Sequence, residues 1–94
     1  MASFEMRETE LEHVAGEVAS AVQDTEIWYP RGSAEYEQRV RLEVYRVLNR
    51  WLVGDARERV LDRARRILKR RGDFQEGLSA MDTLKADMLE EIAV

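Results

Sequence analysis

Residues 55–72, DARERVLDRARRILKRRG, show the clearest helical pattern in the chain and hold eight of its fifteen basic side chains. The apolar side chains of this stretch recur at i, i+1, i+4, i+7 and i+8, a spacing that places them on one face of an α-helix. They are Val60, Leu61, Ala64, Ile67 and Leu68. Because a helix with one apolar face buries it against neighbouring helices, this stretch predicts one member of a helical bundle.

Both ends of the basic helix carry the same boundary signal, a glycine followed by an Asp-x-x-Glu capping box. The two copies are Gly54 with Asp55 and Glu58, and Gly72 with Asp73 and Glu76. They predict a helix over residues 56–71 and the start of a last helix at residue 74. A second start for that last helix, at Ser79 with Asp82, stays open; if it is used, Gly77 marks a break.

Two amphipathic stretches precede the basic helix. Residues 5–23 carry a thin seam of Val and Ala, and residues 33–53 begin at Ser33, a residue type that commonly caps helix N-termini. The apolar side chains of residues 33–53 cover about half of the helix circumference, which is more than one neighbouring helix covers. We therefore expect this helix to be central and to contact at least two others.

Residues 24–32, DTEIWYPRG, form the one clear interruption between these stretches. Pro30 disfavours the α-helical conformation at Tyr29, which predicts a turn or an extended segment. We expect Ile27, Trp28 and Tyr29 to cap one end of the core, although Trp and Tyr are also enriched at binding anchors.

These elements predict an all-α fold and a single domain over residues 1–94, a three- or four-helix bundle with short loops. The helices are expected at roughly residues 5–23, 33–53, 56–71 and 74–92. The chain has no cysteine, which excludes disulfides, thiolate metal sites and cysteine nucleophiles. It shows no signal peptide and no apolar run near the roughly 18 to 20 residues of a membrane span. We therefore expect a cytoplasmic protein with no membrane partner.

Acidic and basic side chains are segregated along the chain. Residues 1–30 carry one basic and seven acidic groups, residues 31–71 carry thirteen and six, and residues 72–94 carry one and six. Such a pattern is typical of a basic centre that binds nucleic acid. It is equally typical of acidic helices that neutralise a basic one, within the fold or across an oligomer.

Four arginines form a row beside the apolar seam of the basic helix and project within about 60° of one another. We call Arg59, Arg63, Arg66 and Arg70 the arginine row. Because guanidinium groups bind phosphate and carboxylate alike, the row predicts a negatively charged partner. The alternative is a solvated face with pairs inside the helix, such as Asp62 with Arg66 and Asp55 with Arg59. Nucleic acid is disfavoured because no aromatic side chain alternates with the arginines and acidic helices flank them.

A weaker motif is Glu10-x-x-His13, which contains the only histidine and has the spacing of carboxylate-bridged di-iron sites. Glu17 lies one turn further on, but these side chains project away from the apolar seam. A metal would therefore need an oligomer that buries them, and we expect no cofactor. The sequence has no second histidine, nucleophile elbow or Gly-rich phosphate loop, so it does not indicate an enzyme.

The sequence as a whole favours a non-enzymatic protein-interaction, adaptor or regulatory protein that associates with itself through complementary acidic and basic helices. The basic face of its second and third helices would meet an acidic surface on another protein or on a second copy of the chain. A small nucleic-acid binder that uses the arginine row is the first alternative, and a metal-dependent oligomer through Glu10 and His13 is the second. The candidate hydrophobic contacts are Leu42, Val53, Trp28 and Tyr29.

Overall fold

The computed structural model describes residues 7–29, 33–51, 56–72 and 74–93, and of residues 88–93 only the backbone. The described residues form four helices and no strand, which confirms the predicted all-α bundle. The helices are α1 (Glu8–Trp28), α2 (Ala34–Arg50), α3 (Arg57–Arg71) and α4 (Gln75–Ala93). None of them, within the described part of the chain, has the length and hydrophobicity that a membrane crossing requires.

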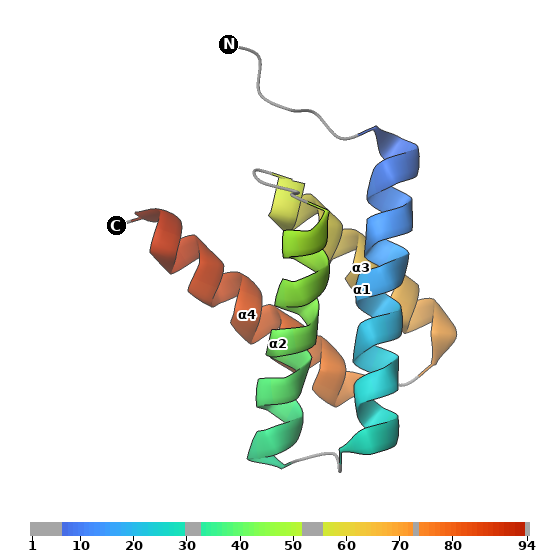
Figure 1. Cartoon of the computed structure of the whole chain (residues 1–94), viewed down its shortest axis with the longest axis vertical. Helices are drawn as coiled ribbons and strands as arrows, with labels where there is room; N and C mark the ends of the chain where they lie inside the picture. The colour runs from blue at the N-terminus through green and yellow to red at the C-terminus, as the bar shows by residue number, and fades with distance from the viewer. Residues whose placement is uncertain (1–6, 30–32, 52–55, 73, 94) are drawn as a thin grey trace.

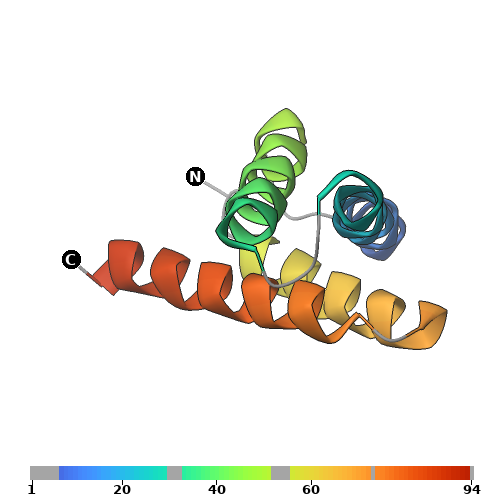
Figure 2. The ribbon, with the colours of Figure 1, turned by 90° about the horizontal axis from the view of Figure 1, so that it is seen from below.

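The helices lie in two layers. α1 and α2 run antiparallel and side by side in one layer, and α3 and α4 form the layer behind them (Figures 1 and 2). α2 packs against α1 and α4, which confirms that it contacts two other helices. α1 packs against two helices as well, α2 and α3. In the part of the chain that the structure describes, the other face of the α1 and α2 layer has no helix over it (Figure 2).

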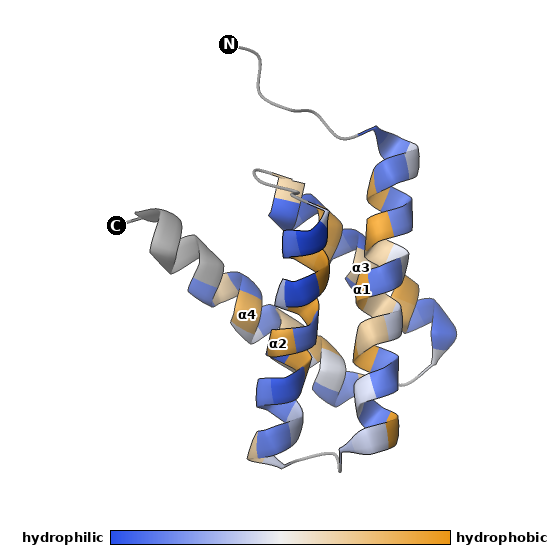
Figure 3. Cartoon of the chain, viewed as in Figure 1, coloured by the Kyte–Doolittle hydropathy of each residue, from blue (hydrophilic) through white to orange (hydrophobic). Residues whose placement is uncertain are grey.

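The hydrophobic core lies where the two layers meet. The seam predicted on the first helix is buried, and α3 presents Val60, Leu61, Ala64 and Leu68 to it. In Figure 3 the hydrophobic sides of α1 and α2 turn toward each other and toward the second layer. The fully buried residues of α1 include Leu11, Val14, Ala15, Val18, Ala19 and Val22. The amphipathic pattern therefore identifies the buried face of each helix correctly.

The C-terminal end of α1 differs from the prediction. The helix continues to Trp28, so the expected interruption over residues 24–28 is wrong. Thr25 is buried in this extension, and its Oγ1 donates a hydrogen bond of 2.8 Å to the carbonyl of Ala21. The predicted effect of Pro30 is confirmed, because Tyr29 has left the helix for an extended conformation with φ −129° and ψ 134°. Proline restricts only the residue before it, which leaves the preceding turn free to stay helical.

Ser33 caps α2 as predicted. Its Oγ accepts a hydrogen bond of 3.1 Å from the backbone N–H of Tyr36. The helix ends at Arg50, three residues before the predicted end, and Trp51 forms its C-cap. The predicted stop at Gly54 and the capping box that starts at Asp55 lie outside the described residues.

The last two helices are joined at Gly72, whose φ of 157° is one that residues with a side chain rarely adopt. α4 begins at Gln75 and runs without a break through Gly77 and Ser79, so the earlier of the two predicted starts is correct. Gly77 is buried where α4 crosses the end of α1, close to Val22 and to the hydroxyl of Tyr36. Its role is therefore close packing of two helices, which needs a residue without a side chain.

Candidate interaction surface

The first half of the arginine row is occupied within the chain. Arg63 Nη1 donates a hydrogen bond of 2.6 Å to Glu12 Oε1, and its Nη2 donates to Glu8. Arg59 Nη2 donates to Glu8 Oε1 at 3.3 Å. The hydrogen bond to Glu12, reinforced by the charge of Glu8, raises the pKa of Arg63 against the opposing effect of desolvation. The acidic helix α1 thus neutralises part of α3 inside one molecule.

The second half of the row faces solvent. Arg66 and Arg70 are exposed, as is Lys69 between them, and none of the three has an ion pair or side-chain hydrogen bond among the described residues. The four arginines consequently do not act as one unit. Only the half of the row near the C-terminus of α3 is left to bind a separate partner.

The acidic residues of α3 pair with α4 rather than within their own helix. Lys85 Nζ lies 2.7 Å from Asp62 Oδ1 and 3.7 Å from Glu58 Oε1. The predicted pairing of Asp62 with Arg66 is therefore wrong. In the opposite sense, Arg65 reaches Asp82 of α4 with two hydrogen bonds of 3.0 and 3.1 Å. Cross-helix pairs replace the intrahelical ones because α4 brings opposite charges onto the same face.

The exposed apolar side chains gather on the other layer. The large hydrophobic residues found exposed in the described structure are Ile27 (75%), Trp28 (79%), Leu42 (43%) and Trp51 (39%), all on α1 or at α2. The expectation that Ile27 and Trp28 cap the core is wrong, whereas the half-buried Tyr29 does pack against it. The exposure of Leu42 agrees with its predicted place outside the buried face of its helix. Val53 lies outside the described residues.

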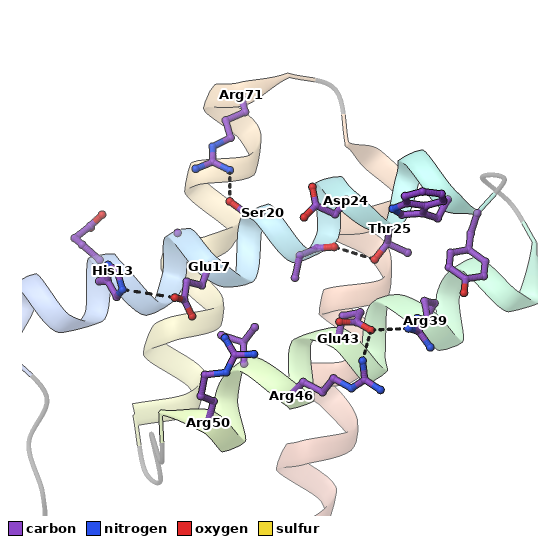
Figure 4. Close-up of a pocket in the computed structure, with 16 residues that line it drawn as sticks. His13, Glu17, Ser20, Asp24, Thr25, Arg39, Glu43, Arg46, Arg50 and Arg71 are labelled. Atoms are coloured by element: carbon purple, nitrogen blue, oxygen red, sulfur yellow. Dashed lines mark hydrogen bonds and ion pairs between the residues drawn. The ribbon is translucent and has the colours of Figure 1, made fainter.

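An open groove of about 1030 Å³ runs between α1 and α2 on this same side of the molecule. Its α1 wall carries Glu12, Glu17 and Asp24, and its α2 wall carries Arg39, Arg46 and Arg50. Figure 4 shows Arg46 and Arg50 on the α2 side of the groove, across from Glu17 and Asp24. Gly16, Ala21 and Val47 line the groove between the charged walls. The α1 wall is therefore acidic, and the α2 wall, which also carries Glu43, has a net positive charge.

Several lining side chains are held in place by their neighbours. Glu43 accepts from both Arg39 and Arg46, each at 3.0 Å, and the guanidinium of Arg39 lies 5.8 Å from the ring centre of Tyr29. Arg71 of α3 also lines the groove, and its Nη1 donates to Ser20 of α1 at 3.2 Å (Figure 4). A partially pre-positioned surface of this kind loses less conformational entropy when it binds a partner.

His13 lines the far end of the groove, and Trp51 lies against it. Trp51 Nε1 donates a hydrogen bond of 2.6 Å to Glu17 Oε2, and the Trp51 ring meets the His13 ring edge-on at 5.2 Å. His13 Nε2 also lies 3.6 Å from Glu17 Oε1. The only histidine is thus engaged with a tryptophan and a carboxylate.

The metal motif is not assembled in the single chain. Glu10 and His13 are exposed on α1, and the described residues contain no group of three or more His, Cys, Asp or Glu side chains that could hold a metal ion.

We call the groove together with Ile27, Leu42 and Trp51 the α1–α2 face. On a helical projection of 100° per residue, Ile27 lies within about 20° of Ser20 on α1, and Leu42 lies within about 60° of Arg39 and Arg46 on α2. The exposed apolar side chains and the charged walls consequently belong to one continuous surface. In comparisons with known proteins, no family model, curated protein or solved structure matches this chain.

The sequence predicted two of the exposed apolar residues, Trp28 and Leu42, as contact candidates, together with the half-buried Tyr29. It placed part of the basic face on the second helix but did not single out Arg39, Arg46 and Arg50. These three arginines recur at i, i+7 and i+11 in the sequence, a spacing that puts them on one helix face. This spacing is weaker than the pattern of the arginine row, which repeats at every turn of α3.

Proposed function

We propose that this chain is a non-enzymatic protein-interaction protein, an adaptor or regulator, that acts through the α1–α2 face. The observation that carries the proposal is the gathering of Ile27, Trp28, Leu42 and Trp51 on one layer, beside a groove lined by arginines. Tryptophan, tyrosine and arginine are the residue types that dominate binding energy in protein interfaces. Among the described residues, the opposite layer shows no exposed large hydrophobic side chain.

The charge on the α1–α2 face sets the kind of partner. The groove presents carboxylates along α1 and guanidinium groups along α2, so a partner gains most when it carries both signs in the reverse order. Such complementarity gives an interface its orientation and excludes surfaces of a single sign. The partner is accordingly a folded protein surface with acidic and basic strips, and a second copy of this chain is one such surface.

A photo-crosslinking amino acid placed at Leu42 tests the proposal in native extract. Leu42 is exposed and on the α1–α2 face, so the substitution leaves the core intact. We expect a discrete protein adduct at this position that survives nuclease treatment. The matched control carries the same group at Arg66, an exposed position on α3, and should give no such adduct. Equal labelling at both positions, or none at Leu42, would show that the face is not an interaction surface.

Nucleic-acid binding is the second candidate, supported by the exposed Arg66, Lys69 and Arg70. These three cations lie on consecutive turns of one helix and are spaced to reach a phosphate backbone. Acidic side chains of α1 and α4 already pair with other arginines of α3, such as Arg63 and Arg65. The site that is left for nucleic acid is therefore smaller than the full arginine row.

A mobility assay with DNA and RNA separates the two candidates. Binding through this patch should weaken steeply with salt, and the slope should fall by about one for each of Arg66 and Arg70 replaced. Replacement of Arg63 should leave the slope nearly unchanged, because Arg63 is already bonded to Glu8 and Glu12. Absence of any retardation at low salt would eliminate this candidate.

A further inference from the structure

We propose that the α1–α2 face binds a second copy of this chain, so that α1 of each protomer lies over α2 of the other. The inference rests on the proposed function and names the partner for the same surface. The α1 wall of the groove carries Glu17 and Asp24, besides Glu12, which is bonded to Arg63. The α2 wall carries the guanidinium groups of Arg39, Arg46 and Arg50, and its one lining carboxylate, Glu43, is paired with the first two of them, so the two walls have opposite net charge. A surface with separated charges of both signs is complementary to itself when the two halves are exchanged.

Only one two-fold arrangement exchanges the walls. In a face-to-face dimer whose axis runs parallel to α1 and α2, each acidic wall lies over the basic wall of the other copy. An axis across the helices would instead place α1 on α1, and like charges at close range are unfavourable. The axis parallel to the helices is therefore the one that the charges select.

The contacts inside one chain fix which residues would meet. Arg39 lies level with Tyr29 at one end of the groove, as their cation–π contact of 5.8 Å shows. Trp51 lies level with Glu17 at the other end, where its Nε1 is 2.6 Å from the carboxylate. Because a two-fold axis parallel to the helices allows no shift along them, each residue of α1 meets the residue of α2 at its own level. Trp28 then lies over the second copy's Arg39, and Glu17 over the second copy's Arg50.

Asp24 provides the central contact of this arrangement. It lies seven residues from Glu17, about 10 Å along the helix, which corresponds on α2 to the level of Glu43. The charge of Glu43 is compensated there by its ion pairs with Arg39 and Arg46, so the α2 wall is positive at this level. Arg46 is one turn from that level, and the reach of its side chain brings the guanidinium of the second copy to Asp24. Within the described residues Asp24 and Arg50 have no hydrogen bond or ion pair of their own, so each gains a partner in the dimer. Each contact occurs twice by symmetry.

The apolar side chains gain from the same arrangement. Ile27 and Trp28 of α1 are each more than 70% exposed in the single chain, and Leu42 flanks the arginines of α2. When two such layers pack face to face, Ile27 and Trp28 of one copy come close to Leu42 of the other and are covered by the interface. A guanidinium group is attracted to the ring of tryptophan more strongly than to other aromatic rings. This attraction stabilises the position of Trp28 against the guanidinium of the second copy's Arg39.

Light scattering coupled to size exclusion tests the dimer, with the whole chain at about 100 µM, a concentration that populates interfaces of micromolar Kd. We expect a dimer for the wild-type chain. Asp24→Arg and Arg46→Asp should each weaken it by roughly tenfold or more, because each places like charges together across the interface. The double variant, Asp24→Arg with Arg46→Asp, should restore the dimer. Arg66→Asp, which makes the same charge change on α3, should leave it unchanged.

Circular dichroism checks that each variant is folded, and Trp28→Ser gives an independent test because Trp28 is too exposed for its loss to affect folding. A monomeric wild-type chain, a dimer that Trp28→Ser does not weaken, or a double charge swap that fails to restore association would each overturn the inference. A wild-type monomer whose Leu42 position still crosslinks to another protein would overturn the dimer alone and leave the interaction role in place. Loss of both results would overturn both.

Discussion

Gly77 of α4 lies so close to Val22 of α1 that a Cβ atom at position 77 would be 2.6 Å from Val22 Cγ1 and 3.2 Å from Tyr36 Oη. Val22 is fully buried, so it cannot move aside into solvent. We therefore expect Gly77→Ala to destabilise the fold by about 1 to 3 kcal/mol, the usual cost of forcing extra volume into a packed core. Urea unfolding followed by circular dichroism measures this difference in the free energy of unfolding.

Gly16→Ala is the matched control. Gly16 also lies inside a helix, but nothing is within 4 Å of the position that its Cβ would take. The same substitution should stabilise the protein here by about 0.5 to 1 kcal/mol, because alanine is the better helix former. We therefore expect the change in the free energy of unfolding to have opposite signs for the two substitutions. An unchanged stability for Gly77→Ala would show that α4 does not pack on Val22 as described.

Arg63 and Arg66 should differ in what they do, although they are neighbours in the arginine row. Arg63→Met removes the hydrogen bonds to Glu8 and Glu12 and should lower the thermal midpoint, whereas Arg66→Met should leave it nearly unchanged. The loss at Arg63 should shrink at high salt, because ions screen exposed charge pairs. Differential scanning calorimetry at low and high salt measures both effects. Equal and salt-independent midpoints for the two variants would contradict an internal role for Arg63.

The boundaries that the sequence predicted well are those set by local chemistry. The cap at Ser33 is confirmed, as are the helical break near Gly72 and the early start of α4, because each depends on groups within one turn of the chain. The end of α1 was missed because Pro30 and Gly32 follow it closely, and these residue types indicate a turn. Its helical state is fixed by tertiary contacts that the local pattern does not contain, such as the hydrogen bond from Tyr36 Oη to Glu26.

The candidate surface was harder to predict than the fold, for a related reason. A helical projection shows which side chains share a face, but not which helix lies opposite that face. The sequence therefore left open whether acidic helices neutralise the arginine row within the fold, which is what Glu12 does to Arg63. The exposure of Trp28 likewise depends on where the neighbouring helices end. It cannot be predicted from the residues next to Trp28 in the sequence.

Lys85 gives the fold a pH dependence in the alkaline range. The hydrogen bond to Asp62, aided by the charges of Asp62 and Glu58, raises the pKa of Lys85 against the effect of desolvation. A raised pKa means that the stabilisation is fully present below the ordinary lysine pKa of about 10.4 and is lost as the pH rises through the raised value. Because arginine stays charged above that pH, Lys85→Arg should match the wild-type stability at pH 8 and exceed it at about pH 11, by less than about 1 kcal/mol.

Urea unfolding of the two proteins at both pH values measures this effect. Their difference isolates residue 85, because the tyrosines that also titrate in this range are common to both. A constant difference in the free energy of unfolding between pH 8 and pH 11 would show that the α3–α4 ion pair does not depend on the Lys85 charge.

The cap of α2 allows a final prediction, since Ser33 Oγ accepts from the N–H of Tyr36 and no intrahelical carbonyl can serve that donor. Ser33→Ala should destabilise the protein by about 1 kcal/mol, while Ser33→Asp, whose carboxylate accepts the same bond at the positive end of the helix, should be close to neutral. Tyr36 follows directly in the core and hydrogen-bonds Glu26, so fraying of this turn should also loosen the end of α1. Hydrogen exchange at the amides of residues 25–28 and 36–38 measures that coupling. Faster exchange in both segments of Ser33→Ala, and in neither segment of Ser33→Asp, is expected, whereas faster exchange confined to α2 would show that the two helix ends open independently.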